Sequence, residues 1–239
     1  PIIFVLAAGY FANWRRILPP ATGSILSKYL FFFGIPFLVF ANITESEMMH
    51  AANFRFLLGY FLTLLISAST AAWIFRAVFK LQGPELIIQI VGSFYSNTTY
   101  IGVPISVILL NSAIPPLMSL LIQVLFFLPA ATALLDVMTL KEKTIRASSI
   151  IRTLVTNPIL VAGIAAILVS TLHIRIPIFF RYSVQLMGAP PMTLGLFALG
   201  FTCYFPDRRG FTRQQVIHAL IGALIKIFYQ PAIAFLLAS

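Results

Sequence analysis

One stretch of the chain combines hydrogen-bonding side chains with residues that interrupt helices, inside an apolar run that extends from about Leu86 to Leu110. That run is long enough to cross a bilayer. Its centre, from Gly92 to Pro104, is polar and helix-breaking, because glycine is permissive in backbone angle and proline donates no amide hydrogen. Irregular backbone at this depth survives only inside protein or along a wet cavity, and a discontinuous helix is typical of a transporter binding site. The candidate site residues are Ser96, Asn97, Thr98, Thr99, Gly102 and Pro104.

The second half of this interrupted helix would present its N-terminus near the middle of the bilayer. Free amides and partial positive charge at that end suit an anionic carboxylate. Asn97 would supply a donor and an acceptor, while the hydroxyls of Ser96, Thr98 and Thr99 would satisfy the freed backbone. The alternative interpretation is a proline kink closed by serine and threonine side chains, with no ligand.

Two charged residues lie within other apolar segments. Lys226 is near the middle of the last segment, where an ionisable group is functional by default. It would bind freed carbonyls or balance a substrate or proton site, unless it snorkels to an interface. Asp136 lies near the cytoplasmic end of the fifth segment and is either part of a proton relay or an interfacial carboxylate. The two residues are about half a membrane apart in depth, so we do not pair them.

Proline and glycine recur at mid-span in two further segments. Gly34-Ile35-Pro36 and Gly188-Ala189-Pro190 form a faint internal repeat. We predict that Pro36, Pro190 and Pro191 are hinges or close-packing sites. His218, near the cytoplasmic side of the last segment, is predicted to be a packing or interfacial residue.

The elements that position these residues are membrane helices. Of the 239 residues, 60% are hydrophobic and only 9% are charged, whereas a soluble domain carries about 25% charged residues. This composition excludes a soluble protein and indicates a polytopic, all-α membrane protein. We predict eight transmembrane helices near residues 1–14, 25–43, 54–79, 86–110, 113–138, 157–172, 178–204 and 214–238, with an interfacial segment at 150–155.

The basic residues fall mainly in alternate loops between these helices. Because cytoplasmic loops are enriched in lysine and arginine, this alternation explains the net charge of +10 without nucleic acid and predicts that the N-terminus lies outside. The loops predicted to be cytoplasmic hold Arg15, Arg16, Lys28, Arg76, Lys80, Lys141, Lys143, Arg146, Arg152, Arg208, Arg209 and Arg213, and the opposite side holds Arg55, Arg175 and Arg181.

Signatures of enzymes and metal sites are missing from the sequence. It contains no H-E-x-x-H, G-x-S-x-G, P-loop or dinucleotide-binding pattern. Its two aspartates, Asp136 and Asp207, are placed wrongly for a catalytic pair, and no His/Cys cluster has metal spacing. Its one cysteine, Cys203, excludes an intrachain disulfide. We therefore expect no enzyme, no cofactor and no metal.

Four stretches resemble the auxin efflux carrier family, which includes bacterial organic-acid permeases and plant PIN-type carriers. The segment from Asn97 to Ile105 closely resembles the broken fourth helix of that family. The likeness spans essentially the whole chain. The weaker matches are Ala8-Gly9-Tyr10 with Arg15-Arg16, Thr156-Asn157-Pro158, and Lys226 with Pro231.

The resemblance implies a ten-helix inverted repeat of five plus five helices, related to the bile acid/sodium symporter fold, with helices 4 and 9 broken. This chain would be a single transporter domain holding the first eight helices. Residues of about 1–43 and 157–204 would form a scaffold, and residues of about 54–138 and 214–238 the transport helices. In the plant carriers the fifth helix borders the substrate, so the resemblance makes Gln123 a further substrate-binding candidate.

The sequence therefore predicts a secondary transporter of a small organic anion that works by elevator-type alternating access in a bacterial inner membrane. H⁺ or Na⁺ coupling and a homodimer remain open. Two alternatives also remain open: a non-transporting sensor or interaction module on the same fold, and a sodium-coupled organic-anion symporter of the bile-acid type.

Overall fold

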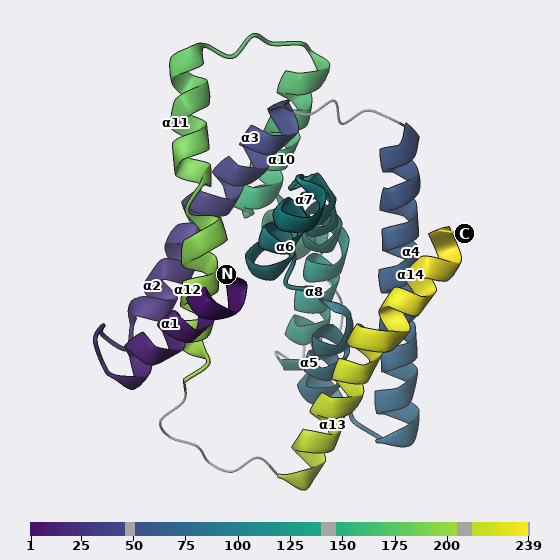
Figure 1. Cartoon of the computed structure of the whole chain (residues 1–239). Coiled ribbons are helices and arrows are strands. Elements are labelled where there is room, and N and C mark those ends of the chain that lie inside the picture. The colour runs from purple at the N-terminus through teal and green to yellow at the C-terminus, as the bar shows by residue number, and fades with distance from the viewer. Residues whose placement is uncertain (46–50, 140–146, 205–211, 239) are drawn as a thin grey trace. The chain divides into compact units, whose positions relative to one another are not determined.

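The computed structural model describes residues 1–45, 51–139, 147–204 and 212–238, and these residues form helices and no strand (Figure 1). By its contacts the chain divides into two compact units. Unit 1 comprises Pro1–Met48, Asn97–Leu121 and Val155–Asp207, and unit 2 comprises Met49–Ser96, Ile122–Leu154 and Arg208–Ser239.

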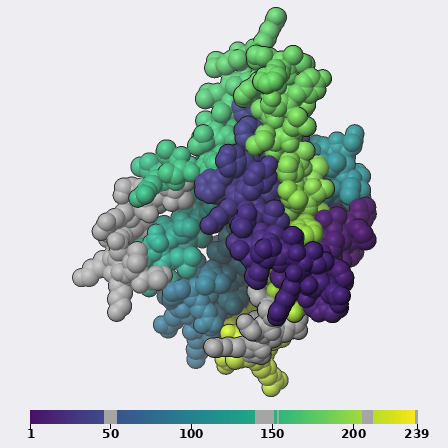
Figure 2. All heavy atoms as spheres, turned by 90° about the vertical axis from the view of Figure 1, so that its left-hand side faces the viewer, coloured from purple at the N-terminus to yellow at the C-terminus, as the bar shows by residue number. Residues whose placement is uncertain are grey.

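Unit 1 is built from α-helices and two short stretches of the wider π-helix, written η. The paired helices are α1 with α12, α3 with α10, and α3 with α11. Figure 2 shows the purple atoms of α1–α3 beside the yellow-green atoms of α11 and α12. The elements are α1 (Ile2–Trp14), α2 (Thr22–Tyr29), η1 (Leu30–Gly34), α3 (Ile35–Glu45), η3 (Thr98–Gly102), α6 (Val103–Leu110), α7 (Ile114–Ile122, whose last residue is in unit 2), α10 (Pro158–Thr171), α11 (Ile178–Gly188) and α12 (Pro191–Thr202).

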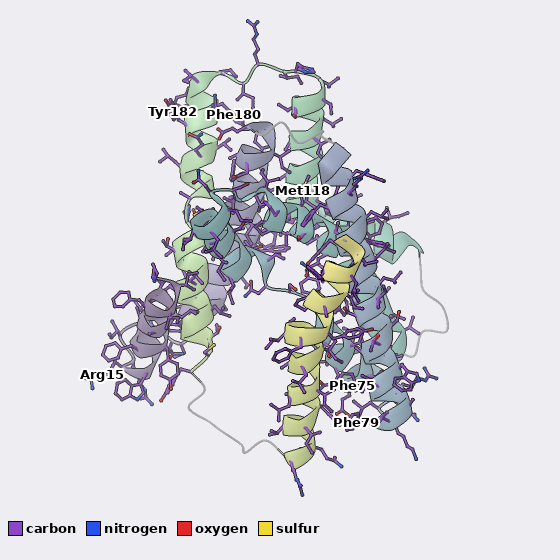
Figure 3. The ribbon with its side chains drawn as sticks, turned by 45° about the vertical axis from the view of Figure 1, so that its right-hand side comes forward. Arg15, Phe75, Phe79, Met118, Phe180 and Tyr182 are labelled. Carbon is purple, nitrogen blue, oxygen red and sulfur yellow. The ribbon has the colours of Figure 1, made fainter. Side chains whose placement is uncertain are left out.

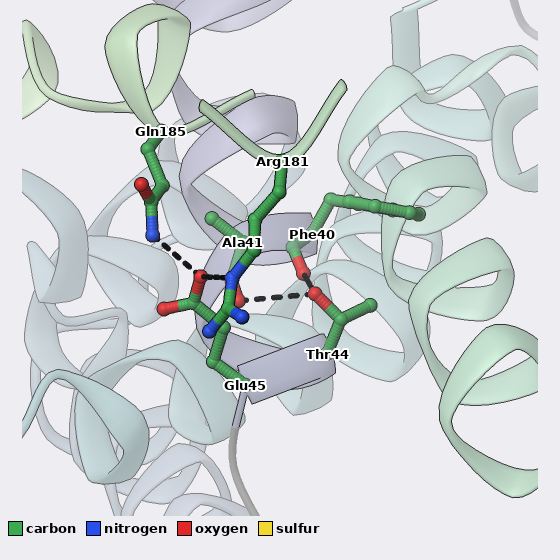
Figure 4. A network of polar contacts seen from close by, with 6 residues as sticks. All are labelled: Phe40, Ala41, Thr44, Glu45, Arg181 and Gln185. Carbon is green, nitrogen blue, oxygen red and sulfur yellow. Dashed lines mark hydrogen bonds and ion pairs between the residues drawn. The ribbon is translucent and has the colours of Figure 1, made fainter. Parts of the chain in front are cut away.

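Glycines let the helices of unit 1 meet backbone to backbone. A β-carbon added at Gly200 would lie 2.0 Å from the carbonyl oxygen of Leu6, and one at Gly9 would lie 2.1 Å from that of Phe197. Both distances are far inside van der Waals contact, so only glycine permits this crossing of α1 and α12. A polar network at the end of α3 adds to the packing of α11, because Glu45 accepts hydrogen bonds from Arg181 and Gln185 (Figure 4).

Unit 2 packs its helices through apolar side chains. Leu64, Phe94 and Ile122 form one buried cluster, and Phe75 is at the centre of another. The elements are α4 (Ala51–Trp73), η2 (Ile74–Val78), α5 (Gly83–Phe94), η4 (Gln123–Phe127), α8 (Leu128–Thr139), α9 (Ala147–Thr156, whose last two residues are in unit 1), α13 (Arg213–Leu224), η5 (Ile225–Tyr229) and α14 (Gln230–Ala238).

His218 on α13 packs among aromatic rings of unit 2. Its imidazole is buried and meets Phe75 and Phe79 edge-on, with ring centroids 6.0 and 4.9 Å away. Figure 3 labels both phenylalanines, which lie beside α13. The prediction that His218 is a packing residue is therefore confirmed.

Most of the π stretches in the described residues precede a proline. In four of the five, the second residue after the stretch is proline: Pro36, Pro104, Pro129 and Pro231. A proline has no N–H to donate, and its ring collides with the carbonyl four residues earlier in an α-helix. Widening the preceding turn moves that carbonyl away, so these prolines explain where the helices are distorted.

Several helical stretches are long and apolar enough to cross a membrane. Within the described ranges these are Thr22–Glu45, Phe54–Val78, Ile114–Met138, Ile178–Thr202 and Arg213–Leu237, while Ile2–Trp14 and Pro158–Thr171 are shorter apolar helices. The prediction of an all-helical, polytopic membrane protein is confirmed. The number of eight spans and the ten-helix inverted repeat remain predictions.

Candidate functional site: the interrupted helix

The interruption predicted within the apolar run Leu86–Leu110 is present. Helix α5 ends at Phe94, Tyr95 is extended with ψ 113°, and helical structure resumes at Thr98. At about 1.5 Å per residue, the helical pieces Gly83–Phe94 and Thr98–Leu110 are roughly 18 and 20 Å long. The chain therefore leaves the helix about halfway along the segment from Gly83 to Leu110.

The interruption is shorter than predicted, and it ends before the glycine and proline that suggested it. Gly102 is the last residue of η3, and Pro104 is in the first turn of α6. A β-carbon added at Gly102 would lie 3.3 Å from the β-carbon of Pro116. The expectation that these two residues form part of the break is wrong. A proline is tolerated in the first turn of a helix, and the π turn before it removes the remaining clash.

Asn97 begins the second helical piece, in unit 1. Its side-chain oxygen accepts a hydrogen bond from the Tyr100 amide at 3.2 Å, which makes it the N-cap. The Asn97 side chain is otherwise exposed, whereas Thr98 and Thr99 are buried. Within the described part of the chain, the hydroxyl of Thr98 has no hydrogen-bond partner. No hydrogen bond to the amides of Thr98 or Thr99 is present among those residues either.

Tyr100 holds this piece against α12. The space for its ring exists because residue 195 is glycine: an added β-carbon there would lie 2.4 Å from the ring. The N-cap and the ring together fix the start of η3 within unit 1.

The end of α5, in unit 2, is held by side-chain amides. The Ser96 amide donates to the Gln123 oxygen at 3.0 Å, and the Gln123 nitrogen donates to the Tyr60 hydroxyl at 3.0 Å. The Gln230 nitrogen donates to the carbonyl of Phe94 at 3.4 Å. The structure therefore brings together Ser96 and Gln123 among the predicted site residues, and it adds Tyr60 and Gln230.

Sequence reasoning assigned the freed backbone to the hydroxyls of Ser96, Thr98 and Thr99, and the structure agrees only for Ser96. The Ser96 hydroxyl reaches the Phe94 carbonyl only at 3.5 Å, and the Thr98 hydroxyl has no partner among the described residues. Glutamines from other helices supply the other side-chain contacts to the backbone at the break. The available signal for Gln230 was a lone amide in an apolar helix, next to a proline.

The two charged candidates, Lys226 and Asp136, make none of these hydrogen bonds. Lys226 is half-buried in η5, and the described residues offer it no ion pair. Asp136 is exposed near the end of α8.

The proline candidates of unit 1 lie at a helix crossing. A β-carbon at Gly34 would lie 2.9 Å from the Pro191 ring, and one at Gly188 would lie 2.8 Å from the Leu38 amide nitrogen. The two segments of the faint repeat thus pack on each other, with Pro36 and Pro191 buried and Pro190 half-buried. Close packing is observed, and a hinge role stays a prediction.

In the described ranges no group of three or more histidine, cysteine, aspartate or glutamate side chains is placed to hold a metal ion.

A search among curated proteins found no match to the chain. A family model described as membrane transport protein matches residues 1–239. This is a family of transporters, not of enzymes, and it is of the auxin efflux carrier type. Since the match extends over the whole sequence, the chain belongs to the membrane transport protein family.

Proposed function

We propose that this transporter moves a small organic anion, a carboxylate, and binds it at the start of the helical piece Thr98–Leu110. One observation carries the proposal: a helix begins in the middle of the apolar run Leu86–Leu110 with unpartnered polar groups. They are the amides of Thr98 and Thr99 and the buried Thr98 hydroxyl, none of which has a partner among the described residues.

These groups have the chemistry that an anion needs. A helix N-terminus carries roughly half a positive charge, and its first amides point along the axis toward an incoming ligand. A carboxylate has two oxygens and can accept from two adjacent amides. Charge-assisted hydrogen bonds of this kind are strong, and they strengthen further where water is excluded.

Asn97 completes the arrangement from an exposed position. Its oxygen is used by the Tyr100 amide, which leaves its side-chain nitrogen available as a donor. Gly102 and Pro104 shape the piece that presents the amides and are not ligands in this proposal. Lys226 supplies a positive charge within the last helix that attracts an anion into the membrane. The position of Asp136 near the end of α8 favours its interfacial interpretation.

We further propose that the carrier works by alternating access, with the glycine-packed helices of residues 1–43 and 157–204 as the static scaffold. Their backbone contacts at Gly9, Gly188 and Gly200 leave no room for sliding, which supports a static role. Residues 54–138 and 214–238 would then move. By contacts, Asn97–Leu121 belongs to unit 1 with the scaffold helices, so the Tyr100–Gly195 contact would have to separate during the cycle.

Substitutions at Asn97 test the binding site. Asn97→Asp keeps the oxygen that caps Tyr100 but adds a negative charge and removes the nitrogen donor, so the fold is retained and anion transport is lost. Asn97→Ala loses the cap as well, at about 1 kcal/mol of stability. The matched control is Asn157→Ala, because Asn157 caps α10 in the same way, accepting from the Ile159 amide at 3.0 Å.

The measurement is uptake of labelled carboxylic acids into proteoliposomes, with folded protein quantified by size exclusion. We expect transport by Asn157→Ala to scale with the amount of folded protein and transport by Asn97→Asp to be abolished. Normal carboxylate transport by a folded Asn97→Asp protein would refute the proposed site.

A further inference from the structure

We propose that Gln123 and Gln230 are positioning residues that hold the backbone at the end of the first half of the interrupted helix, with opposite hydrogen-bonding roles. Gln230 is required as a donor to a carbonyl, and Gln123 is required as an acceptor for an amide. The proposal rests on the proposed function for its effect on transport, but its structural part can be tested independently.

Gln230 donates a hydrogen bond to the carbonyl end of α5. Phe94 is the last residue of that helix, and a carbonyl in the last turn has no amide partner within its own helix. The Gln230 side chain is 7% exposed and points its nitrogen at the Phe94 oxygen. A side-chain N–H is thus supplied where the membrane would offer none.

Gln123 accepts a hydrogen bond from the amide of Ser96, the second residue beyond the end of α5. Its side chain is fully buried, its oxygen accepts from the Ser96 amide, and its nitrogen donates to the Tyr60 hydroxyl. Both ends of the side chain are engaged in these contacts. Gln123 is therefore a support for the backbone in this proposal rather than a ligand of the substrate.

Both glutamines adjoin a π turn, and the turn before Gln230 sets the direction of its side chain. Gln123 opens η4, and Gln230 directly follows η5 and precedes Pro231. Each π turn inserts one residue, which rotates the side chains after it by about 100° relative to an unbroken α-helix. Without η5, Gln230 would face a different side of its helix.

The donor at Gln230 also affects the sign of the charge near the break. The C-terminal end of a helix carries partial negative charge, and Phe94 is three residues before Asn97 in the chain. A bare carbonyl end there would repel an anion. Capping it with an amide nitrogen offsets part of that charge at the end of α5.

The experiment compares substitutions that keep or remove one role. Gln230→Met removes the donor, and Gln230→His keeps one. Gln123→Met removes the acceptor, and Gln123→Glu keeps an acceptor for the Ser96 amide and for the Tyr60 hydroxyl. The control is Thr63→Val, which removes a buried hydroxyl of unit 2. That hydroxyl donates to the Gly59 carbonyl within its own helix.

Two readouts separate positioning from general stability. The first is hydrogen exchange of the peptide that contains Tyr95 and Ser96, which needs no substrate. We expect faster exchange of the Ser96 amide in Gln123→Met, and wild-type exchange in Gln123→Glu and Thr63→Val. The second is carboxylate transport, where we expect both methionine variants to lose about tenfold in turnover per folded molecule and the two conservative variants to retain it.

Unchanged Ser96 exchange in Gln123→Met would overturn the positioning role, whatever the protein transports. Equal losses of transport in Gln230→Met and Gln230→His would overturn the donor role. If exchange changes as expected while no variant, wild type included, transports carboxylates, the proposed function fails and the positioning role stands.

Discussion

The helices inside each of the two units of this transporter pack by a different kind of contact. In unit 1, each of the eight described glycines has atoms of another residue within 4 Å of where its β-carbon would be, and at Gly9, Gly188 and Gly200 those atoms are backbone. In unit 2, Gly59, Gly83 and Gly92 have open space around them. Unit 2 relies instead on apolar clusters and on buried side-chain amides.

This difference teaches where the molecule tolerates change. Backbone packed on backbone has no side chain that can move aside, so a single methyl group must separate two helices. Side-chain packing and side-chain hydrogen bonds can rearrange, at the cost of individual contacts. We therefore expect unit 1 to be sensitive to added volume and unit 2 to be sensitive to lost polarity.

The largest effect is expected at the crossing of α1 and α12. Gly200→Ala places a methyl group 2.0 Å from the Leu6 carbonyl, which should lower the free energy of unfolding by about 3 kcal/mol or more. The control is Gly59→Ala in α4, where the space is open and alanine should stabilise the helix by about 0.5–1 kcal/mol. Thermal unfolding in detergent measures both, and equal stability of the two variants would contradict the comparison.

A smaller effect is expected where a glycine of unit 1 meets a side chain. Gly195→Ala brings a methyl group within 2.4 Å of the Tyr100 ring and should destabilise by about 1–3 kcal/mol. Replacing Tyr100 by alanine removes the ring that the new methyl group would meet. The double variant Gly195→Ala/Tyr100→Ala should therefore lose less free energy of unfolding than the sum of the losses of the two single variants. A double-mutant cycle with no coupling would show that this contact does not position the start of η3.

The sequence predicted the helices well because each carries a long apolar run, which has a strong compositional signal. It also placed the interruption near Asn97, where Ser96, Asn97 and Thr98 gather polar groups inside such a run. It failed on how the backbone at the break is satisfied. Which distant side chain reaches Phe94 depends on the rotation of another helix, and η5 sets that rotation through a local widening that sequence periodicity does not reveal.

In unit 2 the one closely packed glycine among the described residues should respond more mildly. Gly222→Ala meets the hydroxyl of Ser93 at 2.8 Å, a single side-chain atom that also bonds the Gln89 carbonyl. We expect this variant to lose about 1 kcal/mol or less in free energy of unfolding, since the Ser93 hydroxyl can rotate away. Adding Ser93→Ala should restore wild-type stability, and a loss as large as that of Gly200→Ala would contradict the contrast between the units.

The smallest effect concerns the polar network of Figure 4. Glu45 accepts from Arg181 at 2.9 Å and from Gln185 at 2.6 Å, but these side chains are exposed. Solvent screening limits such pairs to about 1 kcal/mol or less. Glu45→Gln should shift the unfolding temperature only slightly, and the shift should shrink at high salt. A large decrease in the unfolding temperature that does not depend on salt would contradict this expectation and show that the network is a main contributor to the stability of unit 1.

The central claim is that the amides of Thr98 and Thr99 receive a carboxylate. Hydrogen exchange of purified wild-type protein, with and without a panel of small carboxylic acids, tests it most directly. We expect a transported acid to slow exchange in the peptide that contains Thr98 and Thr99 and to leave the α10 cap at Asn157 unchanged. Protection that appears only elsewhere in the chain, under an acid that the protein demonstrably transports, would contradict the claim.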